Sequence, residues 1–314
     1  MAMWEGRETG LLQKLVHEAK GVVSRARTDR RHLARDFSRL ALGDYRSRER
    51  FAAMIARTRP KTPDFRPSDE ARALAAQLLT DGYTAPLNLL TPAQAAEIRE
   101  YFIGKPYYDP FRAHLGNFRY PEAPSPDSNQ AYYSIPDTIS APYLLEIANH
   151  PVILQAAELI LGCKPTIDNM ACWWYFAERS QEKGFQRFHR DMDTPRFFKL
   201  FIYLTDTDER SGAQVYVKGS QRSRRLNVSR YINDDEVSNA FGDDKVVRIG
   251  GPAGTCFLGD VYGIHKGGLP IDRPRLMFAV QYNLWPSPFA PRKPLGPRPH
   301  RDLDPYMYRA YFKD

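Results

Sequence analysis

The sequence predicts an α+β protein in which helices come first and an antiparallel β core follows. Up to Gly162, apolar residues recur every three or four positions, which is typical of amphipathic helices. Beyond Gly162, short runs rich in β-branched and aromatic residues alternate with Gly, Pro, Asp and Ser, which is typical of an antiparallel sandwich or barrel. With 314 residues, 42% of them hydrophobic, the chain is long enough for one large domain with appendages.

The first 60 residues are predicted to form a basic helical extension. Leu11, Leu15 and Ala19 begin an apolar stripe at helical spacing within residues 10–58, and basic residues outnumber acidic ones between residues 7 and 61. We expect the stripe to pack on the main domain; contact with an anionic membrane or with nucleic acid is the alternative. The formal charge of +8 arises mostly in this region, so the charge alone does not predict a nucleic-acid partner, and we expect none.

Three further helical segments are predicted before the strands. Ser68 is a candidate N-cap for a helix over residues 68–79, and Thr91 followed by Pro92 begins another over residues 91–102. A third segment runs from residue 142 to Gly162. The aromatic loop 104–133 is long enough to cover a substrate, and an ordinary surface loop is the alternative.

The β core is expected within a main domain that spans residues 61–290. Strands are predicted over residues 167–177, 196–205, 213–220, 245–251, 254–260 and 275–285. A helix over residues 233–242 interrupts them, with Asn233 as its cap and Gly242 as its end. The proline-rich residues 291–314 predict an extended arm that lies on the domain; a ligand for a proline-recognising module is the alternative.

Targeting signals and cysteine pairs are not evident in the sequence. It contains no long apolar run behind a basic start and no stretch of about 18 apolar residues without charges. We therefore expect neither a signal peptide nor a membrane span, and we expect a cytoplasmic location. The three cysteines form no CxxC pair, so buried reduced thiols are expected rather than disulfides or a thiolate metal site.

His189 and Asp191, in the stretch FHRDMD, are the first candidate metal ligands. Residues two apart on a strand point to the same face, so both side chains can approach one ion while Arg190 turns away. Alone, the pair also fits a polar strand end. His265 follows two strand-like runs of the same β region and supplies a third ligand. Two imidazoles and one carboxylate form the facial triad suited to non-haem Fe(II) and oxygen chemistry, and zinc is the competitor.

Arg275 follows His265 and opens the last predicted strand. A planar guanidinium at the mouth of a barrel can bind a carboxylate through two parallel hydrogen bonds, as a dicarboxylate cosubstrate held by iron at its other end requires. A surface arginine at a strand start is the alternative, and Arg273 is a lesser candidate for the same role.

These stretches together resemble the phytanoyl-CoA dioxygenase family of Fe(II)/2-oxoglutarate-dependent oxygenases. The resemblance covers residues 80–285 and is most specific toward the end of that range. Family members share a QxxHxD start, an aromatic and aliphatic strand that ends in an acidic turn, a G-S-H turn, and a distal His followed by an Arg and a Tyr. The matching residues here are Gln186, His189, Asp191, Gly212, Gly219, Ser220, His265, Arg275 and Tyr282.

The resemblance implies a double-stranded β-helix core, of the jelly-roll or cupin-like kind, with N-terminal and flanking helices. It implies Fe(II) and 2-oxoglutarate as cofactors, with Fe(II) held by His189, Asp191 and His265 and the far carboxylate of 2-oxoglutarate held by Arg275. The implied reaction is the hydroxylation, or another oxidation, of a small organic substrate, while 2-oxoglutarate is decarboxylated to succinate. Asp191 favours oxidation over halogenation, because related halogenases carry a small residue at this position.

Further contacts follow from the same resemblance. Lys199, Phe201 and Tyr203 are expected to share the inward face of their strand and to belong to the cosubstrate-binding site, with Phe201 beside the cosubstrate. A core residue, or a snorkelling lysine in the case of Lys199, is the alternative. Gln186 is expected to make a polar contact with cosubstrate or substrate. Of the consecutive Trp173 and Trp174, at most one can line the pocket.

The sequence departs from the family pattern at two positions. Gln221 stands where the G-S-H turn usually has its His, and Gly267 stands where many members carry a hydroxyl residue two positions after the distal His. One contact to 2-oxoglutarate is therefore missing or supplied elsewhere. The nearby Arg222, Arg224 and Arg225 are able to attract an anionic group of the substrate, and a solvated loop is the alternative.

Two other functions compete with an oxygenase. The substrate and the oligomeric state do not follow from the sequence, so a catalytically idle barrel that acts as a binding protein stays open, with the basic N-terminal region on a membrane or on nucleic acid. A zinc-dependent hydrolase or isomerase of cupin-like fold is the third interpretation. The intact triad together with Arg275 favours the oxygenase.

Overall fold

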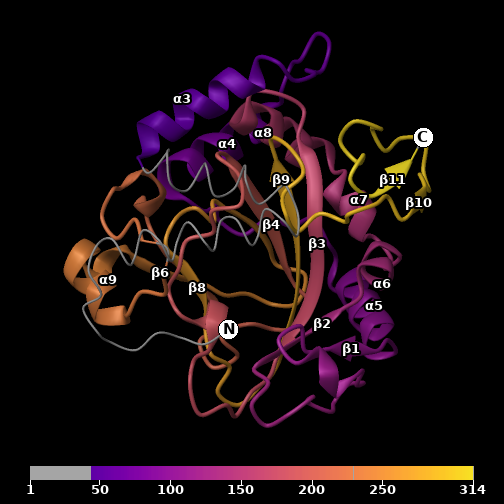
Figure 1. The fold of residues 1–314 in the computed structure, drawn as a ribbon, viewed down its shortest axis with the longest axis vertical. Helices are drawn as coiled ribbons and strands as arrows, with labels where there is room; N and C mark the ends of the chain where they lie inside the picture. Colours follow the sequence, from indigo (N-terminus) through magenta and orange to yellow (C-terminus); the bar gives the residue numbers. More distant parts are fainter. Residues whose placement is uncertain (1–43, 229, 314) are drawn as a thin grey trace.

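The computed structural model describes residues 44–228 and 230–313. Figure 1 shows two larger sheets with helices alongside, and a small two-stranded sheet near the C-terminus. The larger sheet has the strand order β1-β2-β3-β9-β4-β7, and the smaller sheet has the order β6-β5-β8. All strand pairs within these two sheets are antiparallel. The predicted combination of helices with an antiparallel β core is therefore confirmed.

The strands follow the predicted runs closely. In the larger sheet they are β1 (Tyr107–Tyr108), β2 (Gln130–Tyr133), β3 (Thr166–Tyr175), β4 (Phe197–Tyr203), β7 (Cys256–Gly259) and β9 (Arg275–Asn283). In the smaller sheet they are β5 (Gln214–Val217), β6 (Val246–Ile249) and β8 (His265–Gly267), and β10 (Gly296–Pro297) pairs in parallel with β11 (Phe312–Lys313). The sequence did not predict β1 and β8, which are too short to show an alternating pattern. It also did not predict β2, which lies in the segment 104–133 that was interpreted as a loop.

The helices begin and end near the predicted residues. They are α3 (Tyr45–Ala56), α4 (Asp69–Asp81), α5 (Pro92–Ile103), α6 (Ile135–Ile139), α7 (Leu144–Ala148), α8 (Pro151–Leu161) and α9 (Asp234–Phe241), with 3₁₀ turns η1 (Ala113–Leu115), η2 (Gly184–Gln186), η3 (Ser220–Arg222) and η4 (Asp243–Lys245). The Ser68 hydroxyl accepts from Ala71 N at 3.2 Å, and the Thr91 hydroxyl accepts from Gln94 N at 3.3 Å. Both predicted caps are therefore confirmed.

The predicted helical segment from residue 142 to Gly162 is two helices rather than one. Pro151 begins α8, because proline has no N–H to donate to the preceding turn and fits the first position of a helix. The stretch Leu144–Leu161 has the length and composition of a membrane-spanning helix, with 18 residues and a hydropathy of 1.3, and 56% of it is buried inside the protein. In this fold the stretch is part of the core.

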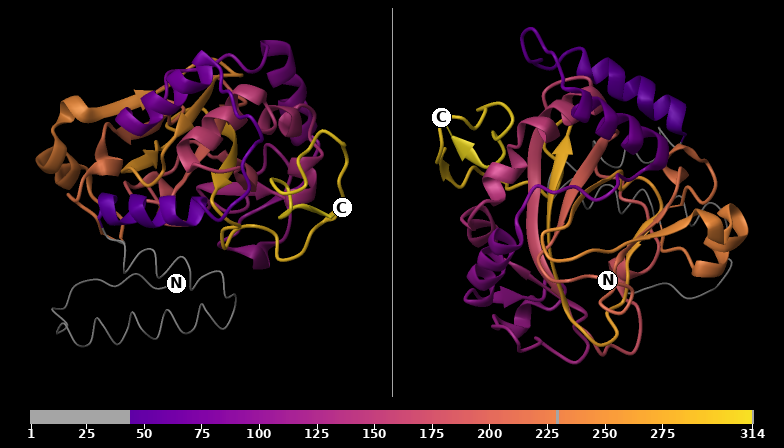
Figure 2. Two further views of the ribbon diagram at one scale, coloured as in Figure 1. Left: turned by 90° about the horizontal axis from the view of Figure 1, so that it is seen from above. Right: turned by 180° about the vertical axis from the view of Figure 1, so that it is seen from behind.

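Two apolar layers lie on the two faces of the larger sheet. On β4, Phe198, Leu200 and Ile202 belong to a core cluster shared with helices α4, α5 and α8. The alternate residues Phe197, Phe201 and Tyr203 belong to a second cluster. That cluster also contains Tyr216 of β5 and Ile249 of β6, so the second layer fills the space between the two sheets. Figure 2 shows the purple N-terminal helices gathered around the larger sheet.

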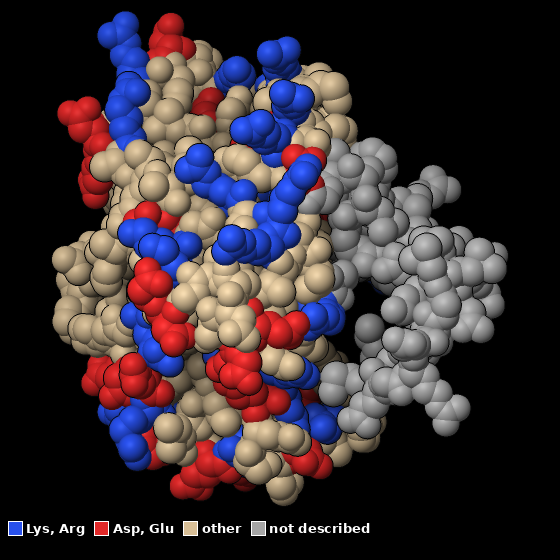
Figure 3. Space-filling view, turned by 90° about the vertical axis from the view of Figure 1, so that its left-hand side faces the viewer, with Lys and Arg blue, Asp and Glu red and all other residues tan. Residues whose placement is uncertain are grey.

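Helix α3 is the described part of the predicted N-terminal extension. Residues 1–43, which contain the first predicted helices, lie outside the described residues. The α3 side chains Arg48, Ala52 and Ala56 are buried, and Arg196 pairs with Glu49 at 2.7 Å. Figure 3 shows the face that carries α3: basic side chains gather over its upper part, and both signs of charge mix lower down. Contact of the basic N-terminal extension with an anionic membrane or with nucleic acid stays the alternative that the sequence left open.

Candidate metal centre and cavity

His189, Asp191 and His265 meet at one point between the two sheets. Their ligand atoms all lie within 4.8 Å of one another, and the two imidazole rings have centroids 4.3 Å apart. The side chains of His189 and His265 are buried, and Asp191 is nearly so. Among the described residues no other group of three His, Cys, Asp or Glu side chains has this geometry. The structure therefore brings together the three residues that the sequence singled out.

Backbone hydrogen bonds set the positions of the three side chains. His189 N donates to His265 O at 3.0 Å, and His265 N donates to His189 O at 3.1 Å, which is a narrow antiparallel bridge. Asp191 N donates to Val261 O at 2.8 Å. The segment that carries His189 and Asp191 therefore forms a bridge to the strand end that carries His265, although the two are far apart in sequence.

Both imidazoles present a free nitrogen to the centre of the site. His189 Nδ1 lies 2.8 Å from Arg187 O, and His265 Nδ1 lies 3.0 Å from Gly263 O. A carbonyl can only accept, so each Nδ1 carries the proton and each Nε2 keeps its lone pair. Burial lowers the pKa of His189, and burial together with the neighbouring His189 lowers the pKa of His265 to about 3. Both rings are therefore neutral near pH 7, as metal binding requires.

Asp191 is an ionised carboxylate with a cationic neighbour. Lys199 Nζ donates to Asp191 Oδ2 at 2.7 Å, and Asp191 Oδ1 lies 3.5 Å from His189 Nε2. Burial raises the pKa of Asp191, but Lys199, His265 and His189 together outweigh it, so the net pKa is lowered. Two neutral imidazoles and one ionised carboxylate are a donor set that Fe(II) or zinc accepts.

Arg275 is completely buried and makes no hydrogen bond of good geometry to any described residue through its three side-chain nitrogens. Its guanidinium carbon lies 4.8 Å from the ring centroid of Tyr175 and 6.0 Å from that of Tyr203. Burial lowers the pKa of Arg275, and the phenols of Tyr203 and Tyr175 oppose that shift. A buried guanidinium without a carboxylate is costly unless an anion is bound, so the residues present fit a carboxylate ligand.

Gly267 lies close to the Arg275 guanidinium and on the same strand as the triad residue His265. On strand β8, His265 and Gly267 are two residues apart and point to the same face. A Cβ atom at Gly267 would lie 3.0 Å from Arg275 Nη2 and 3.2 Å from the Tyr175 ring. The absence of a hydroxyl side chain at this position, noted in the sequence, therefore leaves room for Arg275 to approach the cavity.

A cavity of about 380 Å³ contains the triad. Its wall includes Lys199 and Phe201 of β4, as the sequence predicted, and Trp173 but not Trp174. Further lining residues are Tyr108, Pro110, Phe111, Tyr132, Asn169, Ala171, Tyr175, Phe185, Asp193, Gln214, Gly267, Ala279 and Phe289. Volume and lining are typical of a small-molecule site, with an apolar wall and few polar groups.

Other predicted residues lie beside this cavity rather than in its wall. Tyr203 is buried on the inward face of β4 and donates to Ile249 O at 2.6 Å. Gln186 is buried, and its Oε1 accepts from Asn129 Nδ2 at 2.5 Å. Arg273 is half-exposed and pairs with Asp208 and Asp272, away from the position of Arg275. The side chains of Arg222, Arg224 and Arg225 are exposed and do not line the cavity.

Of three comparisons with known proteins, only the one with solved structures found matches. No family model matches this chain, and no curated protein matches it. A solved non-heme monooxygenase, the ThoJ–Ni complex, is similar at 21% identity and TM-score 0.42, over 67% of this chain and 76% of that chain. The non-heme alpha ketoglutarate dependent epimerase SnoN from nogalamycin biosynthesis is similar at 19% identity and TM-score 0.46, over 68% and 80%.

HygX from Streptomyces hygroscopicus, solved with nickel and 2-oxoglutarate bound, is a third structure to which the chain is similar. Here the identity is 13% and the TM-score 0.47, over 76% of this chain and 95% of that chain. These likenesses are distant, and the geometry of the site is the stronger indication of function.

Sequence reasoning missed several residues of the cavity wall. Asp193 lies two positions after Asp191 on the same segment, so the alternation that linked His189 with Asp191 would also have indicated it. Asn169 lies at an irregularity of β3 and has a positive φ of 48°. No pattern in the sequence indicated this irregularity. Phe185 and Phe289 come from short connecting segments where periodicity carries no information.

Proposed function

We propose that this protein is a non-haem Fe(II)/2-oxoglutarate-dependent oxygenase, similar to the phytanoyl-CoA dioxygenase family, that hydroxylates or otherwise oxidises a small organic substrate. When bound, iron and 2-oxoglutarate supply the oxidising chemistry, in which oxygen is consumed and 2-oxoglutarate becomes succinate. His189, Asp191 and His265 would hold the iron. We also propose that residues 61–290 contain a double-stranded β-helix core and that the protein is cytoplasmic.

One observation carries the proposal: the metal triad and an unpaired buried guanidinium lie on the same side of one short strand. His265 and Gly267 are separated by two residues, which corresponds to about 7 Å along β8. A molecule of the size of 2-oxoglutarate can span that distance. Zinc hydrolysis would use the triad but would leave the Arg275 guanidinium without a partner.

The side chains around the triad have separate tasks in this proposal. Arg275 would bind the far carboxylate of 2-oxoglutarate through two hydrogen bonds and so orient its other end. Phe201 would pack beside the cosubstrate, and Tyr203 would support Arg275 from the same face of β4. Gln186 is proposed to make a polar contact with the cosubstrate or the substrate; its Oε1 accepts a hydrogen bond from Asn129 Nδ2. The apolar surroundings of these buried side chains would strengthen their polar contacts.

The cavity lining favours an uncharged substrate that has an apolar face about the size of a ring. Phe111, Phe185 and Phe289 come from three separate segments, and 65%, 38% and 47% of their surfaces are exposed. They are the exposed phenylalanines of the described chain, and all three line this cavity, so they form an apolar rim around its mouth. Lys199 is the one cationic side chain in the described wall, and it is paired with Asp191.

An anaerobic spectroscopic titration tests the proposal. Fe(II) together with 2-oxoglutarate should give the purified protein a visible charge-transfer band, and His189→Ala should abolish it, because one of the iron ligands is gone. His114→Ala, which changes an exposed histidine outside the cavity, should keep the band. A wild-type protein that shows no band, or that contains zinc and does not respond to 2-oxoglutarate, would contradict the proposal.

A further inference from the structure

The two oxygens of Asp191 have different surroundings. Oδ1 faces the imidazoles, 3.5 Å from His189 Nε2, whereas Oδ2 accepts a hydrogen bond from Lys199 Nζ at 2.7 Å. A carboxylate that coordinates a metal is free to use one oxygen or both, and nothing in the donor type decides between them. Here Oδ2 already has a close cationic partner, whereas Oδ1 is the oxygen that lies next to His189 Nε2.

Lys199 is well placed to hold that oxygen. It lies in the middle of β4, where it pairs with Gly259 of β7 on one side and with Gln281 of β9 on the other. Its strand is therefore an interior one, and its backbone cannot shift without breaking both pairings. The ammonium group makes its one described side-chain hydrogen bond to Asp191.

Lys199 and Asp191 form an ion pair inside the protein, with only 15% and 14% of their side-chain surfaces exposed. The charged hydrogen bond to Asp191 is short and well buried, which makes it stronger than a neutral one. Lys199 and Asp191 therefore form a fixed pair rather than a mobile surface contact.

We propose that Lys199 is a positioning residue that restricts Asp191 to coordination through Oδ1 alone. This inference rests on the proposed function. If Oδ2 were free, Asp191 could turn and place both oxygens on the metal, and the second oxygen would occupy a position that 2-oxoglutarate needs. By holding Oδ2, Lys199 keeps that position open.

This role differs from the one that the family resemblance implied. A lysine that binds 2-oxoglutarate directly would affect the cosubstrate but would not change the metal site in its absence. A lysine that holds Asp191 would change the metal site before any cosubstrate is added. The number of water molecules on the bound metal distinguishes the two roles.

The experiment uses the full chain loaded with Mn(II) and no cosubstrate. Water-proton relaxation reports how many water molecules the metal carries, and a tight-binding titration gives the affinity for Mn(II). In Lys199→Met, relaxation per bound Mn(II) should fall by about a third, because the freed carboxylate oxygen replaces one of the waters on the open positions of the triad. Mn(II) should bind at least as tightly as to the wild type, because a repelling cation is gone.

Two matched variants serve as controls for Lys199→Met. Lys199→Arg keeps a cation that can donate to Oδ2, and its relaxation should stay near that of the wild type. Lys266→Met removes another buried lysine that is paired with carboxylates, those of Glu182 and Asp234, and that follows His265 on β8. It controls for the loss of a buried ion pair and should also leave the relaxation unchanged.

A second titration with 2-oxoglutarate completes the test. Its affinity for the Mn(II)-loaded Lys199→Met protein should fall at least about tenfold, since the cosubstrate must displace a carboxylate oxygen instead of water. Unchanged relaxation in Lys199→Met, with or without weaker 2-oxoglutarate binding, would overturn the inference and leave the proposed function intact. A wild type that binds no Mn(II) would overturn both together.

Discussion

Arg275 carries a buried positive charge that the rest of the described chain does not neutralise. Its neighbours include the rings of Tyr175 and Tyr203 and the backbone of Gly267, none of which carries a negative charge. Leaving such a charge without a partner costs several kcal/mol in a protein interior. The fold tolerates this cost in the free protein, and a bound dicarboxylate would remove it.

Replacing Arg275 should therefore affect the binding of 2-oxoglutarate without lowering the stability of the fold. Arg275→Met should lower the affinity of the Ni(II)-loaded protein for 2-oxoglutarate about 100-fold or more, because the buried partner of a carboxylate is lost. The melting temperature of the metal-free protein should not fall, because an unpaired buried charge is lost as well. Calorimetric titration and thermal unfolding measure the two quantities.

Arg273→Met is the matched control for that pair of measurements. Arg273 is half-exposed and already paired with Asp208 and Asp272, so its loss should change the affinity for 2-oxoglutarate by no more than about twofold. Loss of 2-oxoglutarate binding in Arg273→Met, or full binding in Arg275→Met, would show that the anchor has been assigned to the wrong residue.

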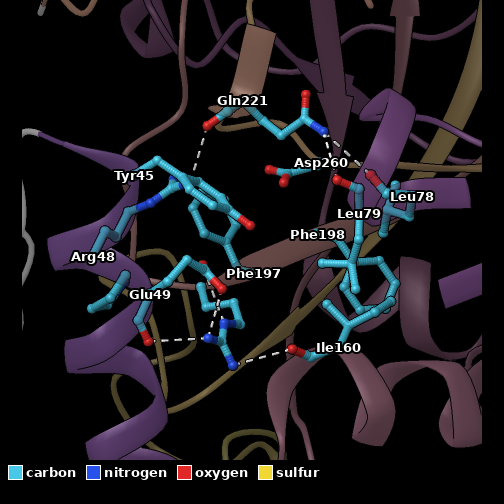
Figure 4. Close-up of a pocket in the computed structure, with 12 residues that line it drawn as sticks. Tyr45, Arg48, Glu49, Leu78, Leu79, Ile160, Phe197, Phe198, Gln221 and Asp260 are labelled. Atoms are coloured by element: carbon cyan, nitrogen blue, oxygen red, sulfur yellow. Dashed lines mark hydrogen bonds and ion pairs between the residues drawn. The ribbon is translucent and has the colours of Figure 1, made fainter. Parts of the chain in front are cut away.

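At the scale of elements, helix α3 packs against the connection that leads into strand β8. Arg48 of α3 lies with its guanidinium carbon 3.2 Å from the ring centroid of Tyr262 and donates to Gln221 O at 3.3 Å. Figure 4 shows Arg48 pointing from its helix toward Gln221, with Asp260 beyond it. Tyr262 lies three positions before His265, and the neighbouring Val261 accepts from Asp191 N.

Arg190 also contacts the connection that leads into strand β8. It lies between His189 and Asp191 and points away from the metal centre, as strand alternation predicted. Its guanidinium donates to the carbonyls of Ser220 at 3.0 Å, Tyr262 at 2.8 Å and Arg225 at 3.0 Å. The two arginines together attach the metal-binding segment to the turn after β5 and to α3.

We therefore expect a change in α3 to be detected at the metal centre. Arg48→Met should lower the free energy of unfolding by about 2 kcal/mol, because a buried cation–π contact and a charged hydrogen bond are lost. It should also weaken metal binding several-fold, because the connection that precedes His265 loses support. Chemical denaturation and a Co(II) titration measure these effects. Arg50→Met, an exposed arginine of the same helix, should do neither.

At the scale of the whole molecule, the C-terminal residues return to the wall of the cavity. Met170 N donates to the Tyr311 hydroxyl at 2.6 Å, and Ile167 N donates to Met307 O at 2.9 Å. Met170 lies within the irregularity of β3 between Asp168 and Ala171, where Asn169 enters the cavity wall, and Ile167 lies just before it. Lys164 and Asp304 add an ion pair at 2.6 Å. The tail thus supplies hydrogen-bond acceptors to β3 within this irregularity and just before it.

Tyr311→Phe tests this role of the tail. The substitution leaves the buried Met170 N–H without an acceptor, so the free energy of unfolding should fall by about 1–3 kcal/mol. Tyr308→Phe removes another completely buried hydroxyl of the tail, one that has no hydrogen-bond partner among the described residues, and should be close to neutral. Equal effects of the two substitutions in urea denaturation would contradict the assignment.

The parts of the fold and site that the sequence predicted depend on short-range regularities. The period of two along a strand placed His189 with Asp191, put Lys199, Phe201 and Tyr203 on one face, and separated Trp173 from Trp174. Capping chemistry placed the starts of α4 and α5 at Ser68 and Thr91. Strand β8 and the break at Pro151 were not predicted, because a very short strand and a single interrupting residue leave the surrounding pattern unchanged.

The sequence by itself determined which side chains share a face and which donor atoms the chain offers for a metal. Only the tertiary structure decided that Arg275 has no carboxylate partner, that Gly267 lies between it and the triad, and that Lys199 holds one oxygen of Asp191. The reason is physical. Local patterns follow from backbone geometry within a few residues, whereas these contacts depend on the register and packing of two sheets whose strands come from distant parts of the chain.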